Sequence, residues 1–137
     1  MVRTFRSVAM ATALLGLSVL RPVNAEAFDL TGAWATQADL CGLVFTKKAG
    51  KVAFAEMSDL YGSGFVIDGK NIRGKTAQCT IQSRKDDGDS IELAAACATT
   101  IMKQNVRFPL KVLDNDNIVR LFPEIEGMTL RYARCKL

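Results

Sequence analysis

The sequence predicts an all-β fold, a small antiparallel barrel or sandwich of about eight short strands stapled by disulfides. Three observations predict it. Short apolar segments with alternating side chains recur along the chain, and clusters of Gly, Asp, Asn and Lys separate them at regular intervals. Four cysteines are available for cross-links. No repeat, linker or low-complexity run divides the chain, so we expect a single domain over residues 26–137.

Residues 1–25 predict a cleaved signal peptide. Residues 1–6 carry two arginines and no acid, and residues 7–20 are apolar or small throughout. Val23 and Ala25 place a β-branched and a small residue at the two positions that a signal peptidase reads, so we expect cleavage after Ala25. The apolar run is shorter than the ~20 residues needed to cross a bilayer as a helix. We therefore expect a periplasmic or secreted protein with no stable membrane insertion after cleavage.

The net charge of the chain lies mostly in this leader. The whole sequence has 18 Lys and Arg residues against 14 Asp and Glu residues. Three basic residues and no acid fall within residues 1–25, so the charge of the remaining chain is 15 minus 14, or +1. A charge this small gives no basis for attraction to nucleic acid or to an anionic surface. We expect a monomer that does not bind nucleic acid.

The four cysteines predict two disulfides, because an exported chain meets an oxidising environment. They are Cys41, Cys79, Cys97 and Cys135. A zinc site is the competing interpretation, but the chain has no histidine and no two cysteines at the short spacing of a zinc-binding pair. We therefore expect no metal.

Side-chain alternation suggests how the cysteines pair. Cys79 and Cys97 each lie on the apolar face of a predicted strand, and residues 84–90 between the two strands contain an Asp-Gly hairpin signal. If the hairpin centres on Gly88, midway between them, the two cysteines face each other. A turn centred half a residue earlier would shift the register and break the pairing. Elimination then pairs Cys41 with Cys135.

The remaining strands follow from the same alternation and from turn residues. We expect them at residues 30–34, 43–45, 52–54, 65–67, around 72, 77–82, 91–97, 106–112, 118–122 and 128–135. Turns are expected at residues 46–51, 68–71, 84–90 and 114–117. The alanine-rich residues 94–102 are the one longer segment that could form a helix, but their β-branched neighbours and the alternation before them favour a strand, and a short helical turn is possible at residues 39–40.

The opening strand, Leu-Thr-Gly-Ala-Trp at residues 30–34, resembles the Gly-x-Trp opening of the calycins. This group contains the lipocalins, the avidins and the small periplasmic inhibitors of bacterial metalloproteases. In calycins a first-strand tryptophan plugs the barrel and an arginine from a late strand packs over it. The resemblance implies that Trp34 is the plug and that Arg131 or Arg134 covers it.

A second resemblance covers the chain more broadly. Tyr61-Gly62-Ser63-Gly64-Phe65 and Ala95-Ala96-Cys97-Ala98 are similar to segments of uncharacterised small exported proteins of alphaproteobacteria, which implies no function.

One loop combines flexibility with aromatic side chains. It contains Tyr61, Gly62, Gly64 and Phe65. Such a loop suits insertion into a protein partner or closure over a barrel mouth, and its aromatic side chains could equally fold back onto the core. We take it as the candidate partner-binding loop.

No group of residues predicts catalysis. Histidine, the usual base near neutral pH, is absent, and no serine is paired with a lysine at a recognised spacing. The acidic runs at residues 86–89 and 114–117 fall where turns are needed and lack the ligands of a calcium loop. We therefore expect no catalytic residues, no enzyme activity and no cofactor.

Three functions stay open at this point. The first is a small exported binding module, such as a protein-binding inhibitor of an envelope or secreted hydrolase, acting through residues 59–65. The second is a carrier of a small apolar ligand inside a calycin-like barrel, where small inward residues such as Ala77 and Ala95 leave room. A carrier needs an internal cavity of roughly 300 Å³. The third is an envelope protein with a structural role.

Overall fold

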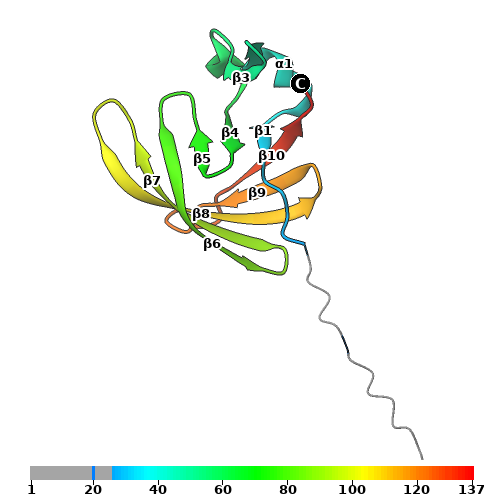
Figure 1. Ribbon diagram of the computed structural model, residues 1–137, viewed down its shortest axis with the longest axis vertical. Helices are drawn as coiled ribbons and strands as arrows, with labels where there is room; N and C mark the ends of the chain where they lie inside the picture. Colours follow the sequence, from blue (N-terminus) through cyan, green and yellow to red (C-terminus); the bar gives the residue numbers. More distant parts are fainter. Residues whose placement is uncertain (1–19, 21–25) are drawn as a thin grey trace, which may run out of the picture.

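A computed structural model describes Leu20 and residues 26–137. The barrel strands are β1 (Gly32–Ala35), β4 (Gly64–Asp68), β5 (Asn71–Arg73), β6 (Gln78–Asp87), β7 (Ser90–Ala98), β8 (Lys103–Asp114), β9 (Asn117–Leu121) and β10 (Thr129–Cys135). They pair antiparallel in the closed order β1-β10-β9-β8-β7-β6-β5-β4 (Figure 1). The predicted all-β, disulfide-bonded fold is confirmed, and its architecture is a barrel of eight strands. Apart from Leu20, the predicted signal peptide lies outside the described residues.

A small unit connects β1 to β4 outside the barrel. It consists of the 3₁₀ turn η1 (Ala38–Leu40), the short helix α1 (Cys41–Val44), the hairpin of β2 (Phe45–Lys48) and β3 (Lys51–Phe54), and the 3₁₀ turn η2 (Ser58–Tyr61). No helix in the described part of the chain has the length and apolar character needed to cross a membrane.

The β2–β3 hairpin differs from its prediction. Residues 43 and 44 belong to α1 rather than to a strand, and the polar residues expected in a long turn continue the ladder down to the Lys48–Lys51 pair. The connection is a tight turn at Ala49 and Gly50, both with positive φ. A two-residue turn of this kind fits the twist of the strands that it joins, so the ladder continues as far as the Lys48–Lys51 pair beside the turn.

Two apolar clusters lie on opposite faces of β1. Trp34 points into the barrel and is fully buried with Ile91 and Ile118. Ala35 points outwards, where it packs with Phe45 and its neighbours in the small unit. The alternation predicted for the opening strand therefore explains both the barrel core and the attachment of this small unit, called the outer unit below.

Both predicted disulfides are present, but the register of the first arises differently. The hairpin turn comprises residues 88–89, which alone would leave Cys79 one residue out of register with Cys97. A β-bulge between Ile81 and Ser83 shifts the ladder by one residue, so the two cysteines lie directly opposite.

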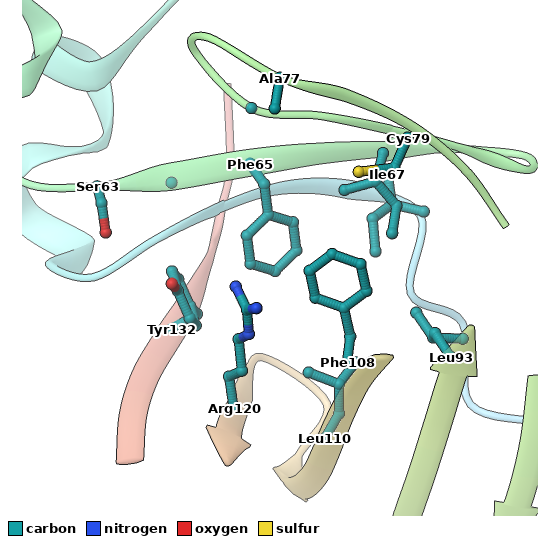
Figure 2. A pocket seen from close by; sticks show the side chains of 13 residues that line it. Ser63, Phe65, Ile67, Ala77, Cys79, Leu93, Phe108, Leu110, Arg120 and Tyr132 are labelled. Atoms are coloured by element: carbon teal, nitrogen blue, oxygen red, sulfur yellow. The ribbon is translucent and has the colours of Figure 1, made fainter. Parts of the chain in front are cut away.

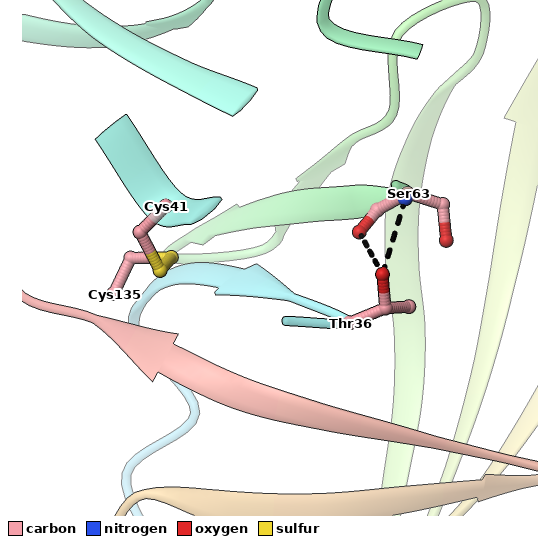
Figure 3. Close-up of a disulfide and its surroundings, with 4 residues drawn as sticks. All are labelled: Thr36, Cys41, Ser63 and Cys135. Atoms are coloured by element: carbon pink, nitrogen blue, oxygen red, sulfur yellow. Dashed lines mark hydrogen bonds between the residues drawn. A yellow bond between two sulfur atoms is a disulfide. The ribbon is translucent and has the colours of Figure 1, made fainter. Parts of the chain in front are cut away.

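The second disulfide joins Cys41, at the start of α1, to Cys135, at the end of β10, across 94 residues (Figure 3). It fastens the outer unit to the barrel wall. Thr36 and Ser63 support the other side of that unit: the Thr36 amide donates to the Ser63 carbonyl over 3.0 Å, and the Thr36 hydroxyl lies 3.3 Å from the same oxygen.

Candidate functional site

One end of the barrel is closed by Trp34 and Arg134. The Trp34 indole Nε1 donates to the carbonyl of Leu30 over 2.9 Å, which ties the ring to the incoming chain. The Arg134 guanidinium lies 4.3 Å from the Trp34 ring and 5.7 Å from that of Phe28, so the cation covers the plug. Of the two arginines that the calycin resemblance implied, Arg134 occupies this position, and Arg131 has an exposed side chain.

The guanidinium of Arg134 also has hydrogen-bond acceptors on several sides. Nη1 donates to the Thr31 carbonyl over 2.6 Å. Nη2 donates to the carbonyls of Asp29 and Asn115 over 2.8 and 3.0 Å. These acceptors come from the segment before β1 and from the β8–β9 turn, so Arg134 joins parts of the chain that are distant in sequence.

The opposite end of the barrel is hollow. A cavity of about 190 Å³ lies among apolar side chains, with Arg120 and Tyr132 as its main polar groups (Figure 2). Its walls include Phe65, Ile67, Leu93, Phe108 and Leu110. Because these side chains come from β4, β7 and β8, the site needs the closed barrel and no single segment could form it.

A second cavity of about 210 Å³ adjoins the first. It shares Ala77, Cys79, Phe108 and Arg120 with the inner cavity and extends to Met102 in the β7–β8 loop. The inner cavity alone is smaller than the roughly 300 Å³ usual for ligand sites. The four lining residues that they share, Arg120 among them, place the two spaces side by side.

Arg120 is the charged side chain at this junction. Its guanidinium carbon lies 4.4 Å from the Phe108 ring centre and 4.6 Å from that of Phe122. Its Nε is buried and has no hydrogen-bond partner within residues 26–137. Burial lowers the pKa of Arg120 from its ordinary value, and the neighbouring Tyr132 and Glu124 oppose that shift.

Sequence reasoning missed Arg120, although a signal was present. Ile118 and Arg120 are two residues apart on β9, so their side chains point to the same face of the sheet. Ile118 is fully buried in the barrel core. An arginine in phase with a core isoleucine is a candidate functional residue, because an unpaired charge is costly to bury.

The four residues of the candidate partner-binding loop have separate positions. Tyr61 is 38% exposed at the surface. A Cβ at Gly62 would lie 2.7 Å from the Thr36 hydroxyl, and one at Gly64 would lie 2.5 Å from the Trp34 carbonyl, so both glycines permit close approach of chain segments. Phe65 packs edge-on against Tyr132 with ring centres 4.8 Å apart and lines the cavity.

Comparisons with protein-family models, with curated proteins and with solved structures each gave no match. Within the part of the chain that the structure describes, no three Asp, Glu or Cys side chains lie close enough to share a metal ion. The cavity and its arginine are therefore the features on which a functional proposal can rest.

Proposed function

We propose that this protein is a binding protein, rather than an enzyme, which carries a small and mainly apolar ligand in the open end of its barrel. The observation that carries the proposal is the pair of adjoining cavities of about 190 and 210 Å³. Their apolar walls favour the transfer of an apolar ligand out of water. The other end, closed by Trp34 and Arg134, leaves the loop end as the entrance.

The cavity sizes bound the ligand. An apolar cavity of about 150 Å³ is large enough to bind benzene. The inner space therefore suits an apolar group of about that size, and the outer space suits a continuation towards Met102. A ligand of this kind has few polar atoms, because the walls provide few partners for them.

The same proposal includes export of the protein and a calycin-like barrel. Both described cystine bridges, Cys41–Cys135 and Cys79–Cys97, are typical of proteins in oxidising compartments. A signal peptide at residues 1–25 would deliver the chain there, to the periplasm or the medium. The packing of Arg134 on Trp34 supports a calycin-like barrel, for which binding inside the barrel is the expected mode.

The carrier function can be tested by filling the cavity. Nile red, an uncharged apolar dye, serves as the probe for the disulfide-bonded protein. Ala77 lines both cavities, so Ala77→Phe should weaken dye binding by tenfold or more. Ala94 on β7 lies opposite Ser83 of β6 and Arg107 of β8 and lines neither cavity, so Ala94→Phe is the matched control. Equal binding by wild type and Ala77→Phe would exclude this site.

A second candidate, a protein-binding inhibitor of an envelope or secreted hydrolase, rests on a separate observation. Met57 and Leu60, beside Tyr61, are 61% and 64% exposed. Met57 also has a left-handed φ of 57°, an unfavourable conformation that a side chain with a functional role can justify. Exposed apolar groups of this kind are typical of interaction sites.

The inhibitor function predicts an effect limited to this segment. Secreted proteases and cell-wall hydrolases would be assayed with the wild-type protein and with Leu60→Asp. Loss of inhibition in the variant, with dye binding unchanged, would support the inhibitor function. Full activity of every hydrolase in the presence of the wild-type protein would count against it.

A further inference from the structure

We infer that the ligand is an anion, with an apolar body ending in one carboxylate or similar oxyanion, and that the guanidinium of Arg120 binds the charged end. This inference deepens the carrier function and rests on it. It names the chemical class of the ligand and the residue that selects it.

The first step is the direction in which Arg120 can still bind. The rings of Phe108 and Phe122 lie within 4.4 and 4.6 Å of the guanidinium carbon, where they satisfy the cation but offer no hydrogen-bond acceptor. The N–H groups of a guanidinium lie in its plane and match the two oxygens of a carboxylate. The ring contacts use none of the donors of Arg120, and Tyr132 beside it is a hydrogen-bond partner for the guanidinium.

The second step is the missing acceptor. The Nε of Arg120 is buried without a hydrogen-bond partner, and none of the ion pairs found among the described residues includes this side chain. Burying a charged donor without an acceptor costs stability, so such groups are rare unless they have a use. An anionic ligand supplies both the acceptor and the counter-charge.

The third step is the contrast with Arg134. Both arginines lie against aromatic rings, one at each end of the barrel. Arg134 donates to three backbone carbonyls, whereas no acceptor within the described residues meets the Nε of Arg120. Arg120 lines a cavity of about 190 Å³ with mostly apolar walls, whereas the hollow beside Arg134 is wider and includes the carboxylates of Asp29 and Asp116. Arg134 finds its acceptors within the described residues, and the Nε of Arg120 does not.

The fourth step is selectivity. Figure 2 shows the guanidinium of Arg120 reaching between Tyr132 and Phe108 towards Phe65. Ile67, on the same wall, adds a further apolar side chain. Charges attract more strongly in such low-dielectric surroundings than in water. A cation entering this space would meet like charge, and a neutral ligand would leave the buried Nε of Arg120 without an acceptor.

Three ligands with the same apolar chain test the inference. Octanoate, octanol and octylammonium would each be titrated into the disulfide-bonded protein by calorimetry. A charge-assisted hydrogen bond predicts that octanoate binds about ten- to a hundredfold more tightly than octanol. Octylammonium should bind more weakly than either.

Two variants assign the effect to Arg120. Arg120→Met should reduce octanoate affinity to that of octanol while leaving octanol binding within about twofold. Arg107 is the matched control, because its side chain is 72% exposed on β8 and pairs with Glu92 outside the cavity. Arg107→Met should bind all three ligands like the wild type. Thermal unfolding of each variant checks that the barrel is intact.

The outcomes separate this inference from the function beneath it. Equal affinity for octanoate and octanol in the wild type, or an octanoate preference that survives Arg120→Met, overturns the anion inference and leaves the carrier function standing. Preferred binding of octylammonium also overturns it. If none of the three ligands and no Nile red binds, the carrier function itself is wrong.

Discussion

Arg134 and Trp34 lie directly opposite each other in the β1–β10 pair, with the guanidinium carbon 4.3 Å from the centre of the indole ring. The pair links the first and last strands of the barrel at its closed end. Because the Arg134 nitrogens also donate to carbonyls in the segment before β1, the cation holds the incoming chain over the plug. Closure of this end depends on the charge and on the shape of one side chain.

Arg134→Met should therefore lower the free energy of unfolding by about 2–4 kcal/mol, since several charge-assisted hydrogen bonds and a cation–π contact are lost together. Urea denaturation measures the change. Arg131→Met removes the same charge from an exposed position on the same strand and should change stability by less than about 0.5 kcal/mol. Equal effects of the two variants would contradict the role assigned to Arg134.

Much of the fold could be predicted because alternation and turn chemistry act locally. The inward face of β1 and the apolar faces of the strands carrying Cys79 and Cys97 follow from a period of two. The register of that hairpin could not be derived safely. The prediction assumed a loop centred on Gly88, whereas a two-residue turn and a compensating bulge produce the same cysteine pair. A bulge depends on both strands and leaves little trace in one of them.

The site was less predictable than the fold. Arg120 was overlooked because charged residues usually face solvent. Its surroundings depend on Phe108 from another strand and on a cavity that only barrel closure creates. The outer unit was assigned incorrectly at residues 43–44, because a short apolar run suits a helix or a strand equally well. Tertiary contacts decide such cases.

The two disulfides should differ in their contribution to stability. The chain-entropy relation gives about 3 kcal/mol for the short loop closed by Cys79–Cys97 and about 4.7 kcal/mol for the long loop closed by Cys41–Cys135. Their sequence separations are 18 and 94 residues. Replacing both cysteines of each pair by alanine should thus cost more for the second pair, by about 1.5 kcal/mol in urea denaturation. The reverse order would show that native contacts outweigh loop entropy.

Gly64 is expected to tolerate no side chain. A Cβ there would lie 2.5 Å from the Trp34 carbonyl oxygen and 2.8 Å from Cζ of Phe45. Gly64→Ala should lower the free energy of unfolding by about 1–3 kcal/mol through overpacking. Gly42 in α1 meets nothing within 4 Å, so Gly42→Ala should leave stability unchanged or raise it by up to about 1 kcal/mol. Thermal unfolding of both variants is the measurement, and a stable Gly64→Ala protein would contradict the contact.

Stability should fall in acid. The Thr31 amide, 2.8 Å from Oδ1 of Asp29, lowers the pKa of that carboxyl, and the Arg84 side chain lowers the pKa of Asp86. Each folded-state pKa lies below the unfolded value of about 3.9, so the stabilisation is complete above that pH and is lost as the pH falls through the folded pKa. Urea midpoints should be level from about pH 5 to 7 and drop below about pH 4. The double variant Asp29→Asn and Asp86→Asn should show a shallower drop.

The stability of Arg120→Met gives a last, independent check on the two arginines. The substitution removes two cation–π contacts worth about 0.5–1 kcal/mol each, but it also removes a charged donor whose burial without an acceptor costs about 1–3 kcal/mol. These ranges combine to a change between a loss of about 1 kcal/mol and a gain of about 2 kcal/mol in the free energy of unfolding, measured by urea denaturation. A loss as large as that of Arg134→Met would mean that Arg120 supports the fold, because a side chain kept for a ligand stabilises the barrel only when the ligand is bound.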